Sequence, residues 1–242
     1  MLNSINPANL ICIDIETAPA HSSITAMNDE WKELWEIKSA RLKQENENKE
    51  EHYFNHAAIY AEFGKVICIT VGVFFKKEKK ENWKFRVKTF AGDDEKKLLS
   101  DFAGLLNKHY SSEKFVFCGH NIREFDIPYL CRRMIVHQIQ IPQIMDVSGK
   151  KPYEVHWVDT MQLWRFGDYK HFTSLRLLTA ILGLPSPKTD MDGSDVGRVY
   201  WKENGLHRIV EYNRRDVVAV AQLILRFKSL PLLSDSEITF AD

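Results

Sequence analysis

The sequence predicts an α/β protein built on a mixed sheet of five strands flanked by helices. Three observations predict it: an apolar segment near the N-terminus, strand-like segments that then alternate with helical ones, and a long amphipathic segment close to the C-terminus. With 242 residues, of which 44% are hydrophobic and 27% charged, the chain can bury a substantial core. We therefore expect one domain over residues 1–242.

The first strand is expected over residues 10–17, where four Ile or Leu residues and one Cys precede any Gly or Pro. Residues two apart on a strand point to the same face, so Asp14 and Glu16 stand side by side. An unpaired buried charge is costly, and divalent cations are the compensation that oxygen ligands favour. The pair therefore indicates part of a metal site.

A charged insertion follows at about residues 28–58. It begins with a weak helical stripe that includes Trp31 and Trp35, and residues 41–51 are nearly all charged or amide. This composition predicts a solvated helix or a mobile insertion rather than a domain. A flap that covers a substrate is the alternative.

The middle of the chain alternates between strand and helix. Two strand-like segments joined by a charged turn predict a hairpin, and Asp93 and Asp94 then offer an N-cap for an amphipathic helix. Strands are expected over 64–75, 83–90, 115–118 and 155–158. Helices are expected after Asp94, over 128–137, around 174–182, after Ser194 and over 206–227. Asp159, at the end of the fifth strand, is interpreted as a helix or turn cap.

The long helix at 206–227 carries Tyr212 and Asp216, which are four residues apart and lie on one side. A helical wheel at about 100° per residue places Asp216 within the buried half, Tyr212 at its edge and Gln222 on the opposite half. An inward-facing Asp is explained by a cap, by a salt bridge to an Arg at the edge of the core, or by a ligand.

Asp126 lies in the segment 119–130 (GHNIREFDIPYL), where a strand gives way to a helix. Pro128 suits a first helical turn, so Asp126 is expected near backbone N–H groups that stabilise a carboxylate. Helix capping and metal binding both explain an acidic residue at this position.

Composition narrows the class of protein. The 33 basic and 33 acidic residues cancel, which argues against tight non-specific binding along duplex DNA but not against an enzyme that touches a few nucleotides through metals. Four cysteines occur singly, without a C-x-x-C spacing, so core packing in a reducing cytosol is favoured over zinc or redox chemistry. No apolar run is long enough to cross a bilayer and no secretory signal is evident, so a cytoplasmic location is expected.

Three motifs in this order resemble the exonuclease motifs of the DEDD superfamily, tyrosine subclass: Asp14-Ile15-Glu16-Thr17, Asn121-x-x-x-Phe125-Asp126 and Tyr212-x-x-x-Asp216. The second motif looks like the proofreading domain of B-family DNA polymerases. The segments 62–72 and 188–196 are similar to free-standing bacterial exonuclease-like proteins. The histidine subclass would carry His where this chain has Glu211. The resemblance implies a ribonuclease-H-like fold.

The resemblance also implies a 3′–5′ exonuclease that hydrolyses phosphodiester bonds from the 3′ end of single-stranded DNA with two Mg²⁺ or Mn²⁺ ions. Its metal ligands would be Asp14, Glu16, Asp126 and Asp216. Tyr212 would complete the catalytic set by orienting the attacking water, because an unperturbed phenol stays protonated at neutral pH. The substrate contacts would be Ile15, Thr17, Asn121, Phe125, Leu175 and Tyr212.

Other functions stay open at this point. The same site could serve a 3′–5′ exoribonuclease, and the same fold could be a catalytically weak nucleic-acid-binding module. For Phe125 and Leu175, core packing is as good an explanation as substrate contact. Arg123 and Lys188 are possible phosphate contacts.

Overall fold

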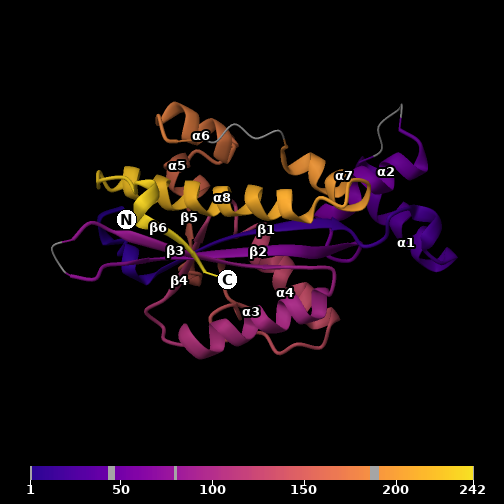
Figure 1. The fold of residues 1–242 in the computed structure, drawn as a ribbon. Coiled ribbons are helices and arrows are strands. Elements are labelled where there is room, and N and C mark those ends of the chain that lie inside the picture. The colour runs from indigo at the N-terminus through magenta and orange to yellow at the C-terminus, as the bar shows by residue number, and fades with distance from the viewer. Residues whose placement is uncertain (1, 43–46, 79–80, 186–190, 242) are drawn as a thin grey trace.

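A mixed sheet runs through the centre of the molecule, which the computed structural model describes over residues 2–42, 47–78, 81–185 and 191–241 (Figure 1). Its six strands have the order β5-β4-β1-β2-β3-β6. Strand β2 is antiparallel to β1 and β3, whereas the pairs β1–β4, β4–β5 and β3–β6 are parallel. The strands are β1 (Leu10–Pro19), β2 (Gly64–Phe75), β3 (Lys84–Ala91), β4 (Val116–Gly119), β5 (Val158–Asp159) and β6 (Ile238–Ala241).

This arrangement confirms the predicted α/β class, a mixed sheet flanked by helices, but the predicted count of five strands is wrong. The sixth strand, β6, pairs in parallel with β3 from the far end of the chain, beginning with Ile238 beside Phe85. β6 has only four residues and none of them is buried, so the segment is too short for its periodicity to predict a strand.

Helices cover both faces of the sheet (Figure 1). Helices α3 and α4 lie on one face, and α8 lies on the other with α5, α6 and α7 on the same side. Their bounds are α1 (Asp29–Ser39), α2 (Lys49–His56), α3 (Glu95–His109), α4 (Asp126–Val136), α5 (Thr160–Arg165), α6 (Leu175–Ile181), α7 (Val196–Trp201) and α8 (Leu206–Phe227). The bounds of β2 and α8 are those predicted.

Successive side chains of β1 point alternately to the two faces of the sheet, and this alternation decides which of them meet α3 and α4 and which meet α8. Odd-numbered residues such as Ile13 belong to the apolar cluster beneath α3 and α4. Even-numbered residues such as Cys12 pack in the cluster beneath α8. Asp14 and Glu16 continue this second set, so the strand delivers both carboxylates to the layer that holds α8. The register with β2 shifts just after Glu16, a bulge of the kind that re-aims side chains near active sites.

The insertion at 28–58 is not the solvated helix that its charge predicted. Its described part forms α1 and α2 around a small aromatic core in which Trp35 and Tyr53 are buried. Their rings meet edge to face at 5.4 Å. The insertion also contacts the sheet, because the Thr17 hydroxyl donates to the Ala58 carbonyl at 2.9 Å. Two aromatic residues of the charged segment therefore form a small core together with Met27 and Phe63, which lie on either side of it.

The fifth strand is shorter than predicted. Only Val158 and Asp159 pair with β4, because the carbonyls of Val155 and Trp157 instead accept hydrogen bonds from the guanidinium of Arg123. Asp159 is the N-cap of α5, a helix that was not predicted, and its carboxylate accepts from two N–H groups of the first turn. The interpretation of Asp159 as a cap is confirmed.

Gln222 corrects the helical wheel, which placed it opposite the buried half of α8. Its side chain is buried and pairs with the backbone of Leu233 in both directions, at 2.8 and 3.0 Å. The segment after α8 lies against that side of the helix, so a face that would be exposed on an isolated helix is covered.

Cys12, Cys68 and Cys118 are buried, Cys131 is half-buried, and all four are free thiols. This confirms the predicted core packing. Within the described ranges, no helix combines the length and apolar character needed to cross a bilayer.

Candidate active site

Three carboxylates converge between β1 and α8. Asp14 and Glu16 extend from the strand and Asp216 from the helix, and each places an oxygen within 4.8 Å of the other two. The strand parity and the helical wheel both direct these groups into the same layer, where apolar contacts such as Cys12 with Val217 hold α8 on the sheet. The helix–sheet packing therefore sets the separation of the three carboxylates.

Asp126 reaches the same place from α4. It is the first residue of that helix and is buried, and its Oδ1 accepts a hydrogen bond from the backbone N–H of Ile15 at 3.1 Å. Ile15 lies between Asp14 and Glu16, so this hydrogen bond holds the carboxylate of Asp126 beside the two acidic residues of β1. The four predicted metal ligands come from three elements: Asp14, Glu16 and Asp216 form the group within 4.8 Å, and Asp126 lies beside it, near enough to raise the pKa of Asp14.

Burial and mutual repulsion make this cluster unstable as four anions. Burial raises the pKa of Asp14 well above its usual range, and the charges of Asp126, Glu16 and Asp216 raise it further. Burial and Asp216 do the same for the pKa of Glu16. Burial also raises the pKa of Asp126 to about 7 and that of Asp216 to about 6.

Within the described residues, no Lys or Arg forms an ion pair with any of the four. Among the residues that the structure describes, no Lys or Arg side chain thus balances the cluster through an ion pair. A group of oxygen donors with excess negative charge fits hard divalent cations such as Mg²⁺ and Mn²⁺.

Asn213 is a member of the site that the sequence analysis missed. Its side chain is fully buried, and its Nδ2 donates to Oδ2 of Asp14 at 2.6 Å. This amide lowers the pKa values of both Asp14 and Glu16, in opposition to burial. The thiol of Cys68 donates to the amide oxygen at 3.4 Å, which orients the amide. The wheel that found Asp216 could have found Asn213, since it is also a polar residue on the buried half.

Tyr212 is half-buried, in agreement with its predicted place at the edge of the buried half of α8, and it lies beside Asp216. Burial and the charges of Asp216, Glu16 and Asp14 raise the pKa of its phenol. A hydrogen bond from Tyr212 lowers the pKa of Asp216. The phenol therefore stays protonated at neutral pH and remains a donor.

The predicted substrate contacts differ in what they offer. Ile15 packs in the core beneath α3 and α4, and its N–H is taken by Asp126. Thr17 donates its hydroxyl to Ala58. Asn121 has a left-handed backbone (φ 67°), and its side-chain oxygen is buried without a hydrogen-bond partner in the described part of the chain. Of these three, Asn121 alone presents an unused polar atom.

Phe125 and Leu175 are both half-buried at the edges of apolar clusters. The ring of Phe125 lies 5.4 Å from that of Tyr129, and Leu175 packs on the clusters beneath α8. Core packing accounts for both positions.

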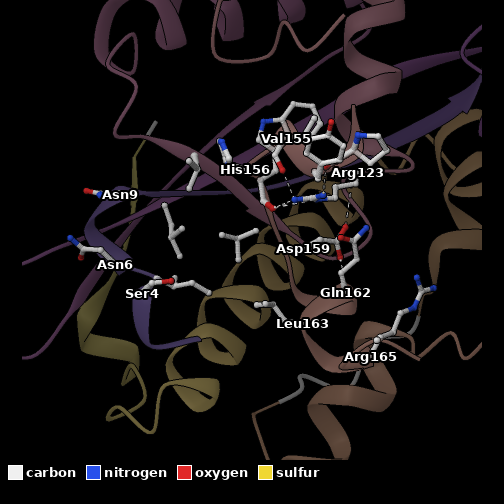
Figure 2. A pocket seen from close by; sticks show the side chains of 18 of the residues that line it. Ser4, Asn6, Asn9, Arg123, Val155, His156, Asp159, Gln162, Leu163 and Arg165 are labelled. Atoms are coloured by element: carbon white, nitrogen blue, oxygen red, sulfur yellow. Dashed lines mark hydrogen bonds between the residues drawn. The ribbon is translucent and has the colours of Figure 1, made fainter. Parts of the chain in front are cut away.

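Arg123 is engaged by the backbone. Its guanidinium donates to the carbonyls of Val155 at 2.6 Å and Trp157 at 2.7 Å, and so it is not free to bind a phosphate. Figure 2 shows Arg123 beside Val155. It lines a pocket of about 640 Å³ beside β5, to which neither the four carboxylates nor Tyr212 contribute. Lys188, the other possible phosphate contact, lies outside the described residues.

Residues 59–236 match the sequence profile of a family described as predicted 3′–5′ exonucleases related to the exonuclease domain of PolB. The matched range contains Asp126, Tyr212 and Asp216, whereas Asp14 and Glu16 precede it. A search among curated proteins found no match.

Among solved structures, the chain is similar to the family B DNA polymerase from the hyperthermophilic archaeon Pyrobaculum calidifontis. The similarity has a TM-score of 0.49 and 16% sequence identity, and it covers 91% of this chain and 25% of the polymerase chain. The chain thus spans about a quarter of the length of that polymerase.

Proposed function

Because the chain belongs to the family of predicted 3′–5′ exonucleases related to the exonuclease domain of PolB, we propose that it hydrolyses phosphodiester bonds from the 3′ end of single-stranded DNA. Family membership bears out the resemblance drawn from the three motifs. The observation that carries the proposal is the convergence of four buried or half-buried carboxylates with no Lys or Arg ion pair described for any of them.

Asp14, Glu16, Asp126 and Asp216 would hold two divalent ions, Mg²⁺ or Mn²⁺. Such ions supply an activated water near neutral pH and stabilise the leaving oxygen. Asp14 suits a shared position, because its pKa responds to the charges of all three other carboxylates. Glu16 and Asp216 would complete one site and Asp126 the other.

Two neighbouring residues of α8 would support these ligands. Asn213 holds Asp14 in its ionised form and in one orientation through the 2.6 Å hydrogen bond. Tyr212 is a protonated phenol whose hydrogen bond goes to Asp216 in this structure; in the reaction it would redirect that hydrogen bond to the attacking water and so orient it.

The terminal nucleotide would lie beside Asn121 and Thr17, with Phe125 next to the base or sugar. The unpartnered oxygen of Asn121 supports this placement, since a buried acceptor without a donor is costly unless a ligand supplies one. The choice of DNA rests on the relation to PolB. RNA would use the same carboxylates, and a cytoplasmic location stays a prediction from the sequence.

The test is a cleavage assay on 5′-labelled single strands of DNA and RNA, with Mg²⁺, Mn²⁺ or a chelator. The wild type is compared with Asp14→Asn and Asp216→Asn, which keep side-chain size but remove a ligand charge. Asp235→Asn, at an exposed position, is the matched control.

We expect a ladder that shortens from the 3′ end, is lost in chelator and in both ligand variants, and persists in the control. A ladder on RNA alone would identify an exoribonuclease. Strand binding without cleavage under either metal would identify a binding module.

A further inference from the structure

We propose that Glu47, His52 and His56 form a Zn²⁺ site in the insertion, separate from the carboxylate cluster. His52 and His56 are four residues apart on α2, so their rings lie on the same face of the helix. Glu47 directly precedes Asn48, the N-cap of α2. One potential ligand atom from each of the three residues lies within 4.8 Å of the other two.

The distances fit a single small cation. Oε2 of Glu47 lies 3.0 Å from Nδ1 of His52 and 3.1 Å from Nε2 of His56. With Zn–N and Zn–O bonds of about 2.0–2.2 Å, ligand atoms around a tetrahedral zinc are roughly 3.3–3.5 Å apart. An outward movement of a few tenths of an ångström would therefore make room for the ion.

The chemistry of the donors favours zinc over magnesium. Two imidazoles and one carboxylate form a mixed nitrogen and oxygen set, which suits Zn²⁺, whereas Mg²⁺ prefers oxygen alone. The two imidazole nitrogens nearest Glu47 are the atoms that would bind the ion, so zinc would replace their hydrogen bonds to the carboxylate and the displaced protons would pass to solvent.

The surroundings hold the ligands in place. The amide of Asn55 donates to Oε1 of Glu47 at 2.7 Å, an outer partner of the kind that orients ligands in metal sites. The ring of His52 lies 5.5 Å from that of Trp35 in the aromatic core of the insertion. The side chain of His52 is 4% exposed and that of His56 is 22% exposed, so solvent reaches the site from the His56 side. A water molecule could supply the fourth ligand there.

Bound zinc would connect Glu47, which precedes the N-cap of α2, to His52 and His56 within that helix. The insertion meets β1 where Ala58 accepts the hydrogen bond from Thr17, next to Glu16. Zinc would therefore stabilise the part of the insertion that borders the carboxylate cluster. None of its ligands belongs to that cluster, so the zinc site does not depend on the proposed exonuclease function.

The experiment starts from metal-free protein that carries Asp14→Asn and Asp216→Asn, so that the oxygen cluster contributes little. Zn²⁺ is added in the presence of excess Mg²⁺, and bound zinc per chain is measured after equilibrium dialysis. We expect one zinc per chain. At a hundredfold excess of free Zn²⁺ over Kd, the Tm should rise by about 5–10 °C.

The substitutions Glu47→Gln and His56→Gln should abolish zinc binding and the rise in Tm. His207→Gln, at an exposed position on α8, should change neither. Co²⁺ is also added to the protein that carries only Asp14→Asn and Asp216→Asn, so this measurement does not depend on whether the zinc-ligand variants fold. We expect visible absorption typical of four-coordinate cobalt, and Zn²⁺ should displace the cobalt.

Two outcomes would overturn the proposal. One is the absence of bound zinc in the parent protein, with no cobalt absorption, in which case Glu47 only accepts hydrogen bonds from the two histidines. The other is equal zinc binding by the parent and by folded His56→Gln. Neither outcome bears on cleavage of nucleic acid.

Discussion

Asn213 donates a hydrogen bond of 2.6 Å to Asp14, although 199 residues separate them in the sequence. The bond joins α8 to β1 inside the carboxylate cluster. This hydrogen bond also lowers the pKa of Asp14, so a neutral amide stabilises the ionised carboxylate without a cation. Asn213 therefore opposes the repulsion that its neighbours create, and it sets the direction in which the Asp14 oxygens point.

Asn213→Ala should weaken metal binding more than it weakens the fold. Without the amide, the pKa values of Asp14 and Glu16 rise further, so protons compete better with the metal. Loss of such a supporting partner typically costs about 10–100-fold in metal affinity or activity. The Mg²⁺ concentration for half-maximal cleavage should rise accordingly and fall again at higher pH. Asn107→Ala, at an exposed position on α3, is the control. An unchanged Mg²⁺ requirement would contradict the role given to Asn213.

Tyr212→Phe and Asp216→Asn should separate water orientation from metal binding. Loss of the phenol should slow cleavage about 10–100-fold, as expected for a residue that positions a reactant through one hydrogen bond. Loss of the Asp216 charge should reduce cleavage to background. The rates are compared under single-turnover conditions at saturating Mn²⁺. Complete loss of activity in both variants would show that Tyr212 does more than orient water.

The metal-free protein should be less stable at neutral pH than at mildly acidic pH on account of this cluster. In the folded state the pKa of Asp126 is raised to about 7 and that of Asp216 to about 6. A raised pKa means that the folded protein binds the proton more tightly than the unfolded chain, for which it is about 3.9. The stabilising contribution is therefore complete below about pH 4 and is lost as pH rises through 6 and 7.

Thermal denaturation in chelator between pH 5 and pH 8 measures this effect. The Tm of the wild type should fall by more over this range than that of Asp216→Asn, because the variant no longer titrates at residue 216. Adding Mg²⁺ should raise the Tm of the wild type most at the higher pH. Parallel pH profiles for the two proteins would rule out the expected contribution of Asp216.

Glu95→Gln should destabilise the protein without altering the active site. The buried carboxylate of Glu95 pairs with Arg133 at 2.6 Å and also accepts from the N–H of Val66 at 2.7 Å. Removing one partner of a buried ion pair costs about 3–5 kcal/mol, because the other charge is left uncompensated. For a chain of this size, the Tm should fall by about 6–20 °C. Glu113→Gln, at an exposed position, should change it little.

Glu95 also gives the opposite pH dependence to the carboxylate cluster. Burial raises its pKa, but the hydrogen bonds from Arg133 and Val66 outweigh burial and hold the pKa below the usual value. Its stabilising contribution is therefore present at neutral pH and is lost on acidification. As pH falls below about 4.5, Glu95→Gln should therefore lose less stability than the wild type. An equal or larger loss in the variant would contradict this assignment.

Local periodicity was enough to predict β2 and α8, and the strand and helix repeats place Asp14 with Glu16 and turn Asp216 inward. That Asp126 joins these three was an expectation from the resemblance of the three motifs to the DEDD superfamily and not from periodicity. Local periodicity could not predict the hydrogen bonds between Gln222 and Leu233 or the pairing of β6 with β3. Both depend on a segment after α8 that returns to the helix and to the sheet edge, a contact that no local pattern encodes.

The insertion shows a different limit. Its charge density predicted solvation, but Trp35 and Tyr53, together with Met27 and Phe63 on either side of the insertion, were enough to form a core beneath the charged surface. Asn213 was missed for a simpler reason. A single buried amide is ordinarily satisfied by backbone groups, and only the positions of Asp14 and Glu16 reveal why it points inward.

Since β1 and α8 meet at the carboxylates, a cation held there would link these two elements, which lie far apart in the sequence. With the ion bound, separation of α8 from the sheet would require breaking coordination bonds. Without the ion, repulsion between the carboxylates of β1 and that of α8 would destabilise the packing of the helix on the sheet. Occupancy would then govern not only turnover but also how tightly the fold is closed.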